Sequence, residues 1–246
     1  MQSRCSVIVQ DLVRAFSSHA NSERAVGMSA YMRNLFPFFG ISSQDRRKLQ
    51  QETLINQGGS LTIEEAFTCA EALYAHQERE LHYAACDILV NALSKKALDA
   101  LSDRERKEFL QRTQALLTQH QWWDTVDVLA PRVAGGLLRG HHTLLDAWTL
   151  KLASSDDFWL QRSAIICQLH YKQETDADII YRSILICANS KEFFVRKAAG
   201  WALRQYAYVN SSAVAEFVAA HPELSGLTKR EALKRIVVSR FRGKDD

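Results

Sequence analysis

The stretch FWLQRSAIICQLHY, residues 158–171, returns as FFVRKAAGWALRQY, residues 193–206, at an offset of 35 residues. Aromatic residues match aromatic residues in the two copies, and base matches base at Arg162 and Lys197. Both copies have helical periodicity, and a repeat of this length built from helices is typical of α-solenoids. The repeat therefore predicts an all-α fold of stacked helix pairs.

Helical periodicity continues through almost the whole chain. Two capping boxes, Thr62 with Glu65 and Ser102 with Glu105, predict helix starts. ERELHYAACDILV, residues 78–90, looks like a degenerate copy of the repeat. No segment alternates convincingly between apolar and polar residues as a strand would.

The expected architecture is a HEAT-like α-solenoid of antiparallel helix pairs, forming a single domain over residues 1–246 with a concave basic groove. An unrelated helical bundle is the alternative. The chain has 246 residues of which 47% are hydrophobic, which is enough for a substantial core. Only three prolines and ten glycines occur, and so few turn residues argue against a β-sandwich or barrel.

The spacing of the cysteines and the N-terminal residues indicate the cellular compartment. The five cysteines are scattered and form no Cys-x-x-Cys pair, which is typical of reduced thiols packed inside helices. Asp11 and Arg14 interrupt the apolar run near the start, so we expect no signal peptide. No apolar run reaches the length of a transmembrane span. We therefore expect a cytoplasmic protein with no membrane partner.

Positive charge is concentrated toward the end of the chain. The formal net charge is only +3, but residues 191–242 hold ten Lys or Arg against four Asp or Glu. Such a concentration is expected of a surface that binds a polyanion.

One basic stripe stands out in this region. Lys197, Trp201 and Arg204 fall at i, i+4 and i+7 of a predicted helix and share one face. A core Trp between two basic stems is the commoner arrangement. However, two cations beside one indole also suit a groove that holds phosphate together with base or sugar. Arg162, the repeat equivalent of Lys197, is expected to project into the same groove.

WWDTVD, residues 122–127, places two indoles beside two carboxylates. Trp123 and Asp127 stand four apart and share one helical face. Asp124 suits a first helical turn, where an acid faces the positive helix end. Pro131 has no N–H, so the carbonyl of Asp127 loses its helical partner there. The sequence therefore predicts a kink or helix end close to Asp127, which suits a site better than a packing surface.

Other chemistries leave no signature. The sequence contains no His-Glu-x-x-His, no Walker loop and no Gly-x-Ser-x-Gly. His141 and His142 lack acidic or thiol neighbours in the sequence. We expect no metal and no cofactor.

Five segments in colinear order resemble one family. They are YMRNLFPFFGISSQDRR (31–47), WWDTVD (122–127), WLQRSAI (159–165), SKEFFVRKAAGWALRQYA (190–207) and LTKREALKRI (227–236). Together they resemble the AlkD family of bacterial DNA alkylation-repair glycosylases. The resemblance implies HEAT-like repeats that wrap duplex DNA in a concave basic groove. It also implies removal of positively charged N3- and N7-alkylated purines while the damaged nucleotide stays stacked in the duplex. Most glycosylases instead flip the base out.

The resemblance also assigns residues to roles. It implies that Asp127, Trp123 and Trp201 are catalytic. The residues expected to bind DNA are Arg162 and Tyr31 from matching motifs, with Lys197 and Arg204 from the basic stripe. An alkylated purine that is already cationic leaves as a neutral base, so positive charge develops on the deoxyribose. A carboxylate can stabilise that charge, and indole faces attract cations.

The remaining expectations concern the partner and the alternatives. The partner is expected to be duplex DNA containing alkylated purines. The protein is expected to be a monomer that is associated with the nucleoid when bound to DNA. His170 stands where the family motif has a lysine, which puts a phosphate contact there in doubt at neutral pH. Asp127→Asn is expected to abolish most excision and to leave fold and DNA affinity nearly unchanged. One alternative is a catalytically silent relative that binds damaged or branched DNA; the other is a protein-scaffold solenoid.

Overall fold

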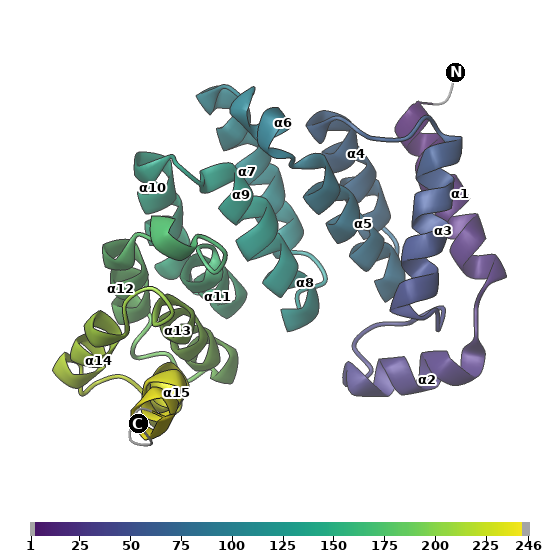
Figure 1. The fold of residues 1–246 in the computed structure, drawn as a ribbon. Helices are drawn as coiled ribbons and strands as arrows, with labels where there is room; N and C mark the ends of the chain where they lie inside the picture. Colours follow the sequence, from purple (N-terminus) through teal and green to yellow (C-terminus); the bar gives the residue numbers. More distant parts are fainter. Residues whose placement is uncertain (1–2, 243–246) are drawn as a thin grey trace. The chain divides into compact units, whose positions relative to one another are not determined.

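Every regular element between residues 3 and 242 is a helix (Figure 1). The structure is a computed structural model that describes the backbone of residues 3–242 and the side chains of residues 3–234 and 236. The contacts between residues divide the chain into two compact units, unit 1 (Met1–Arg112) and unit 2 (Thr113–Asp246). The all-α, solenoid-like fold predicted from the repeat is confirmed. The single domain and the concave groove stay predictions.

Unit 1 contains the first helices of the chain. Their bounds are α1 (Arg4–Ser18), α2 (Ser22–Tyr31), α3 (Ser43–Asn56), α4 (Ile63–Tyr74), α5 (Arg79–Ala92), α6 (Lys95–Asp99) and most of α7 (Asp103–Leu117). The predicted capping boxes are present, because Thr62 and Ser102 exchange hydrogen bonds with Glu65 and Glu105. α4 packs on α5 and on α1, around fully buried side chains such as Phe16 and Phe67.

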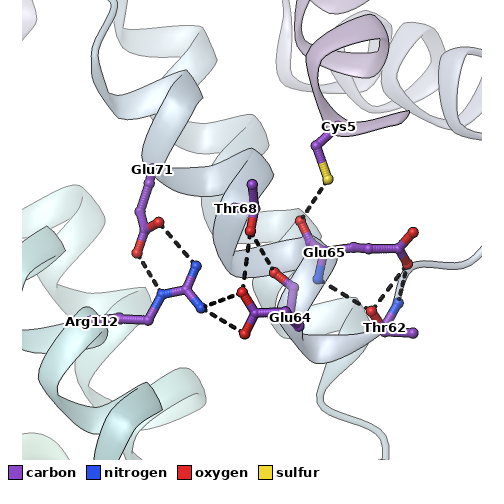
Figure 2. A network of polar contacts seen from close by, with 7 residues as sticks. All are labelled: Cys5, Thr62, Glu64, Glu65, Thr68, Glu71 and Arg112. Atoms are coloured by element: carbon purple, nitrogen blue, oxygen red, sulfur yellow. Dashed lines mark hydrogen bonds and ion pairs between the residues drawn. The ribbon is translucent and has the colours of Figure 1, made fainter. Parts of the chain in front are cut away.

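Arg112 ties α7 to α4 within unit 1 (Figure 2). Its guanidinium donates to both carboxylate oxygens of Glu71, at 2.6 and 2.9 Å, and to both of Glu64, at 2.9 Å. The same group lies 5.0 Å from the ring centre of Phe67, which stacks on Phe109 with ring centroids 4.9 Å apart. One cation therefore joins a polar and an aromatic contact between these two helices.

Unit 2 contains the remaining helices. Their bounds are α8 (Trp123–Val128), the π-helix η1 (Leu129–Ala134), α9 (Gly135–Leu138), α10 (His142–Ala153), α11 (Phe158–Ile166), the 3₁₀ turn η2 (Lys172–Glu174), α12 (Ala177–Ile186), α13 (Phe193–Tyr206), α14 (Ser211–Ala220) and α15 (Gly226–Arg242). α10 packs on α11, α11 on α13, and α13 on α15, so the successive helix pairs stack side by side.

The 35-residue repeat is visible in the starts of three helices. The N-cap residues of α8, α11 and α13 are Trp122, Asp157 and Glu192, which are evenly spaced by 35 positions. Each helix therefore presents its residues in the same order relative to its start. The predicted equivalence of Arg162 and Lys197 is confirmed in this register. The register also adds Asp127 to the set, because Asp127 stands 35 positions before Arg162.

Candidate functional site

The backbone changes its hydrogen-bond pattern directly after Asp127. α8 ends at Val128, and a π-helix follows from Leu129 to Ala134, with Pro131 inside it. The predicted helix end near Asp127 is confirmed, and the missing N–H of Pro131 explains why the α-helical pattern stops there. Single π-turns of this kind are frequent at functional sites. Asp127 therefore lies in the last turn of a short helix.

The two sides of α8 are separated by burial. Thr125 and Val126 are buried in the unit, whereas Trp123 and Asp127 are only partly buried. This is the division expected if the face shared by Trp123 and Asp127 is the working face of the helix.

Asp127 forms a bidentate ion pair with Arg162 of α11. Arg162 Nε donates to Asp127 Oδ1 and its Nη2 to Oδ2, both at 2.7 Å. The third direction of the guanidinium is used as well, because Nη1 donates to the carbonyl oxygen of Phe194 at 2.7 Å. The side chain of Arg162 is 5% exposed and that of Asp127 19% exposed. The pair is therefore rigid, and its accessible edge belongs to the carboxylate.

The pKa of the Asp127 carboxyl group is raised despite its ion pair with Arg162. Burial raises the pKa of its carboxyl group above the ordinary value, and the nearby Asp124 acts in the same direction. The hydrogen bonds and charge of Arg162 oppose this rise in pKa without cancelling it. The ionised carboxylate is thus less stable than in water, which leaves it able to interact with a second cation.

Aromatic rings surround the Asp127–Arg162 pair. The guanidinium carbon of Arg162 lies 5.9 Å from the ring centre of Trp201 and 6.0 Å from that of Phe194. Phe194 continues into a cluster with Trp122 and Trp159, at centroid distances of 5.3 and 4.7 Å. Trp159 and Phe194, which are equivalent positions of the repeat, are therefore neighbouring rings in one aromatic cluster. Trp201, as predicted, lies next to the carboxylate-bearing pair.

Arg162 has a different setting from the one predicted. We expected it to project into a groove like Lys197, but it is buried and each of its three guanidinium nitrogens donates a hydrogen bond. The reason is the 35-residue register, which places an acid at the equivalent position of the preceding helix. The expectation that Asp127→Asn leaves the fold nearly unchanged stays a prediction, and the ion pair with the buried Arg162 is what it puts to the test.

The basic stripe of α13 lies on the same unit, but its cations are not free. Lys197 Nζ lies 2.8 Å from Glu231 Oε1, and Arg204 donates to Glu231 Oε2. Lys234 of α15 is a third partner of the same carboxylate. Sequence reasoning counted Glu231 only as one acid within a basic region. Of the ten basic residues counted there, Arg235, Arg240 and Arg242 have side chains outside the described residues.

Comparisons with known proteins identify the family of the chain. The family model for DNA alkylation repair enzymes matches residues 12–236. The chain belongs to this family. A search of curated proteins gives no significant match.

A solved structure supports the assignment. It is a predicted DNA alkylation repair enzyme from Enterococcus faecalis, with 31% sequence identity and a TM-score of 0.72. The alignment covers 87% of this chain and 95% of the other. The resemblance to the AlkD family is confirmed at this level, and family membership supports an enzymatic role in alkylation repair.

Tyr31 belongs to the other unit. It is the last residue of α2 in unit 1, and 72% of its surface is exposed. Asp127 lies in unit 2, and the role of Tyr31 near it stays a prediction. Within unit 1, the loop after α2 is fixed by the buried Glu80, whose carboxylate accepts hydrogen bonds from the backbone N–H groups of Phe39, Gly40 and Ile41.

The surroundings of His170 lower the pKa of its ring. Burial lowers the pKa of its ring, and the positive charges of Arg132 and Arg139 lower it further. At neutral pH the ring therefore carries less positive charge than an ordinary histidine. The departure from the family lysine removes a permanent cation from this position.

Among the described residues, no group of three or more His, Cys, Asp or Glu side chains could hold a metal ion. In the same part of the chain, no helix combines the length and apolar character needed to span a bilayer.

Proposed function

We propose that the chain is a monofunctional DNA glycosylase that hydrolyses the N-glycosidic bond of cationic N3- and N7-alkylated purines in duplex DNA. The observation that carries this proposal is the partly exposed carboxylate of Asp127, fixed by Arg162, whose guanidinium lies 5.9 Å from the ring centre of Trp201. Trp123, on the working face of α8, and Trp201, on α13, supply the aromatic surfaces. The family assignment supports alkylation damage as the target.

The chemistry needs stabilisation of positive charge and no general acid. An N3- or N7-alkylated purine is already cationic, so it departs as a neutral base while the deoxyribose gains oxocarbenium character. Asp127 can stabilise that sugar cation and orient a water molecule for attack. The faces of Trp123 and Trp201 can contact cationic edges of base or sugar, each contributing about 1–2 kcal/mol when desolvated.

Arg162 would act through Asp127 by holding it in place. A carboxylate has about four lone-pair directions, and the two hydrogen bonds from Arg162 occupy only part of them. The remaining lone pairs are available at the exposed edge. Fixing the carboxylate before the reaction avoids reorganisation when charge develops, which is the main source of electrostatic catalysis.

The other assignments concern DNA binding. Lys197, Arg204 and Tyr31 are proposed to contact the duplex, with the lesion left stacked rather than flipped. Arg162 keeps its proposed DNA contact only if the guanidinium rearranges on binding, since all three of its directions are engaged. We expect the enzyme to work as a monomer without a cofactor, in the cytoplasm with the nucleoid.

A catalytically silent DNA-binding relative is the competing function. It is favoured by one observation, namely that both oxygens of Asp127 already accept from Arg162. The two functions differ in a single measurement, which is whether a base is released.

The test is incubation with duplex DNA that contains N7-methylguanine, followed by chromatography of the released base. We expect release of N7-methylguanine and of N3-methyladenine. Duplexes with uracil or hypoxanthine should stay intact even at high enzyme concentration, because these neutral bases need protonation to leave. Release of neutral bases would point to a general acid. No release of any cationic purine would favour the silent relative.

A further inference from the structure

Glu231 of α15 collects three cations on one buried carboxylate. Lys197 Nζ and Lys234 Nζ lie 2.8 and 2.5 Å from Oε1, and Arg204 donates to Oε2. Glu231 itself is 5% exposed, whereas the side chains of Lys197, Arg204 and Lys234 are 38%, 29% and 56% exposed. The anion lies beneath the surface, and the cations lie around it at the surface. We call these four residues the Glu231 cluster.

Close contact between two helices brings Glu231 into this position. A Cβ atom on Gly200 of α13 would lie 2.4 Å from the Cβ of Glu231 and 2.9 Å from the carbonyl oxygen of Thr228. Only glycine allows α15 to approach this closely. The contact is reinforced by the hydroxyl of Thr228, which donates to the carbonyl oxygen of Arg196 at 3.0 Å. The glycine in KAAGWALR thus serves the packing of α15.

The charges of the Glu231 cluster do not cancel. One carboxylate and three cations leave an excess of two positive charges. Each lysine has three N–H donors and the arginine five, and only some are used by Glu231. Without the carboxylate, three like charges at this spacing would repel one another and spread into solvent. With it, they remain together on one surface and keep free donors.

We propose that Glu231 is a positioning residue that gathers Lys197, Arg204 and Lys234 into one binding site for backbone phosphate of duplex DNA. Trp201 lies between Lys197 and Arg204 on the same helix face and contacts Arg162, so the site adjoins the Asp127–Arg162 pair. The inference rests on the proposed function for its partner. It adds Lys234 as a phosphate contact. It also means that an acidic residue favours the binding of an anionic ligand.

The test compares two Glu→Gln variants that change net charge equally. Glu231→Gln alters the Glu231 cluster, and Glu216→Gln alters an exposed acid of α14 in the same unit. Binding of a fluorescent, undamaged duplex is measured by anisotropy at several salt concentrations. Charge alone predicts tighter binding for both variants. We expect Glu216→Gln to bind as tightly as the wild type or slightly more tightly. Glu231→Gln should bind about fivefold more weakly, because three long side chains must then be immobilised on binding.

Two lysines of α15 provide the second arm, which does not depend on removing the buried acid. Lys234→Ala should reduce the slope of log affinity against log salt by about one, as expected for the loss of one phosphate contact. Lys229→Ala is the matched control, since Lys229 bonds to the carbonyl oxygen of Pro222 instead. Its slope should change less. In the Glu231→Gln background, Lys234→Ala should have little further effect on the slope.

Each outcome decides the matter. Equal or tighter binding by Glu231→Gln than by Glu216→Gln would overturn the positioning role, as would equal slopes for Lys234→Ala and Lys229→Ala. If Glu231→Gln does not fold, the two lysine variants still decide the phosphate contact. A wild-type chain that binds no duplex would overturn this inference and the proposed function together. A chain that binds duplex but releases no base would overturn only the proposed activity.

Discussion

Asp127 and Glu231 are both carboxylates of unit 2 that are paired with cations, yet the pKa values of their carboxyl groups are shifted in opposite directions. Asp127 has one partner, Arg162, and burial raises the pKa of its carboxyl group. Burial would also raise the pKa of Glu231, but the hydrogen bonds and charges of Lys197, Lys234 and Arg204 outweigh burial and lower its pKa to about 2. The number of cations around each acid accounts for the difference.

The comparison separates an acid whose charge is partly balanced from one whose charge is more than balanced. The charge of Glu231 is more than balanced, so this residue has no capacity left for another cation. The charge of Asp127 is only partly balanced, and its exposed edge can meet a cation that forms during a reaction. The two acids are thus expected to respond differently to substitution, and the following experiments test that expectation.

The largest expected effect is on catalysis by Asp127→Asn. An amide cannot offset the developing sugar cation, so single-turnover release of N7-methylguanine should fall by about a hundredfold or more. Glu231→Gln should lose far less rate when DNA is saturating, because it acts on binding. The control is Glu216→Gln, which alters an exposed acid. A near wild-type rate for Asp127→Asn would remove Asp127 from the chemistry.

The next effect concerns the coupling of Asp127 and Arg162. Arg162→Ala leaves the buried carboxylate of Asp127 without its cation, so it should lower the free energy of unfolding by about 3 kcal/mol. Asp127→Asn should lower it less, because burial raises the pKa of Asp127 and a neutral amide avoids that burial penalty. The double variant should lose less than the sum of the single losses. Denaturant unfolding of the four proteins measures this directly, and additive losses would contradict a coupled pair.

Arg162→Ala also tests how Arg162 relates to DNA. If Arg162 acts through Asp127, the salt dependence of duplex binding should be nearly unchanged in this variant. If its guanidinium contacts phosphate instead, the slope should fall by about one. The salt series thus distinguishes a positioning arginine from the DNA-binding role that the sequence resemblance implies.

A smaller effect is expected at Gly200, where α15 approaches α13. Gly200→Ala places a methyl group 2.4 Å from the Cβ of Glu231, which should destabilise the protein by about 1–3 kcal/mol. Gly27→Ala is the matched control, because nothing lies within 4 Å of its Cβ position in α2. That change should stabilise the protein by up to about 1 kcal/mol. Thermal unfolding of both variants provides the comparison.

The last expected effect is a pH dependence of opposite sign for the two acids. The pKa of Glu231 is lowered from an ordinary 4.5 to about 2, so its stabilisation is present above pH 4.5 and is lost as pH falls toward 2. The stability gap between wild type and Glu231→Gln should therefore shrink over that range. For Asp127 the pKa is raised, so its contribution to stability declines as pH rises through the folded pKa. Unfolding measured from pH 2 to 7 for wild type and both variants tests the two signs.

Much of the fold could be predicted from the sequence. Helical periodicity and the offset between residues 158–171 and 193–206 gave the class and the repeat, because burial of one helix face must repeat along the chain. The effect of Pro131 on the helix after Asp127 was also predictable, since a missing N–H is a local property. The candidate residues Asp127, Trp201 and Arg162 were found by motif and spacing.

Which charges would meet was not predictable in the same way. Asp127 pairs with a residue 35 positions away, and Glu231 joins Lys197 and Arg204 across α13 and α15. Counting charges along the sequence treats Arg162 as a groove cation and Glu231 as one acid within a basic region. Such a count does not identify the residue with which each of them pairs.

The sequence by itself determined that this protein is helical and repetitive, with an acid, indoles and bases at fixed positions along particular helices. These properties follow from spacing along one helix. Only the tertiary structure decided that Arg162 is buried against Asp127 and that Gly200 admits Glu231 beneath three cations. The physical reason is that the electrostatic energy of a charge depends on its distance to other charges and on its exposure to water, and both are set by how the helices pack.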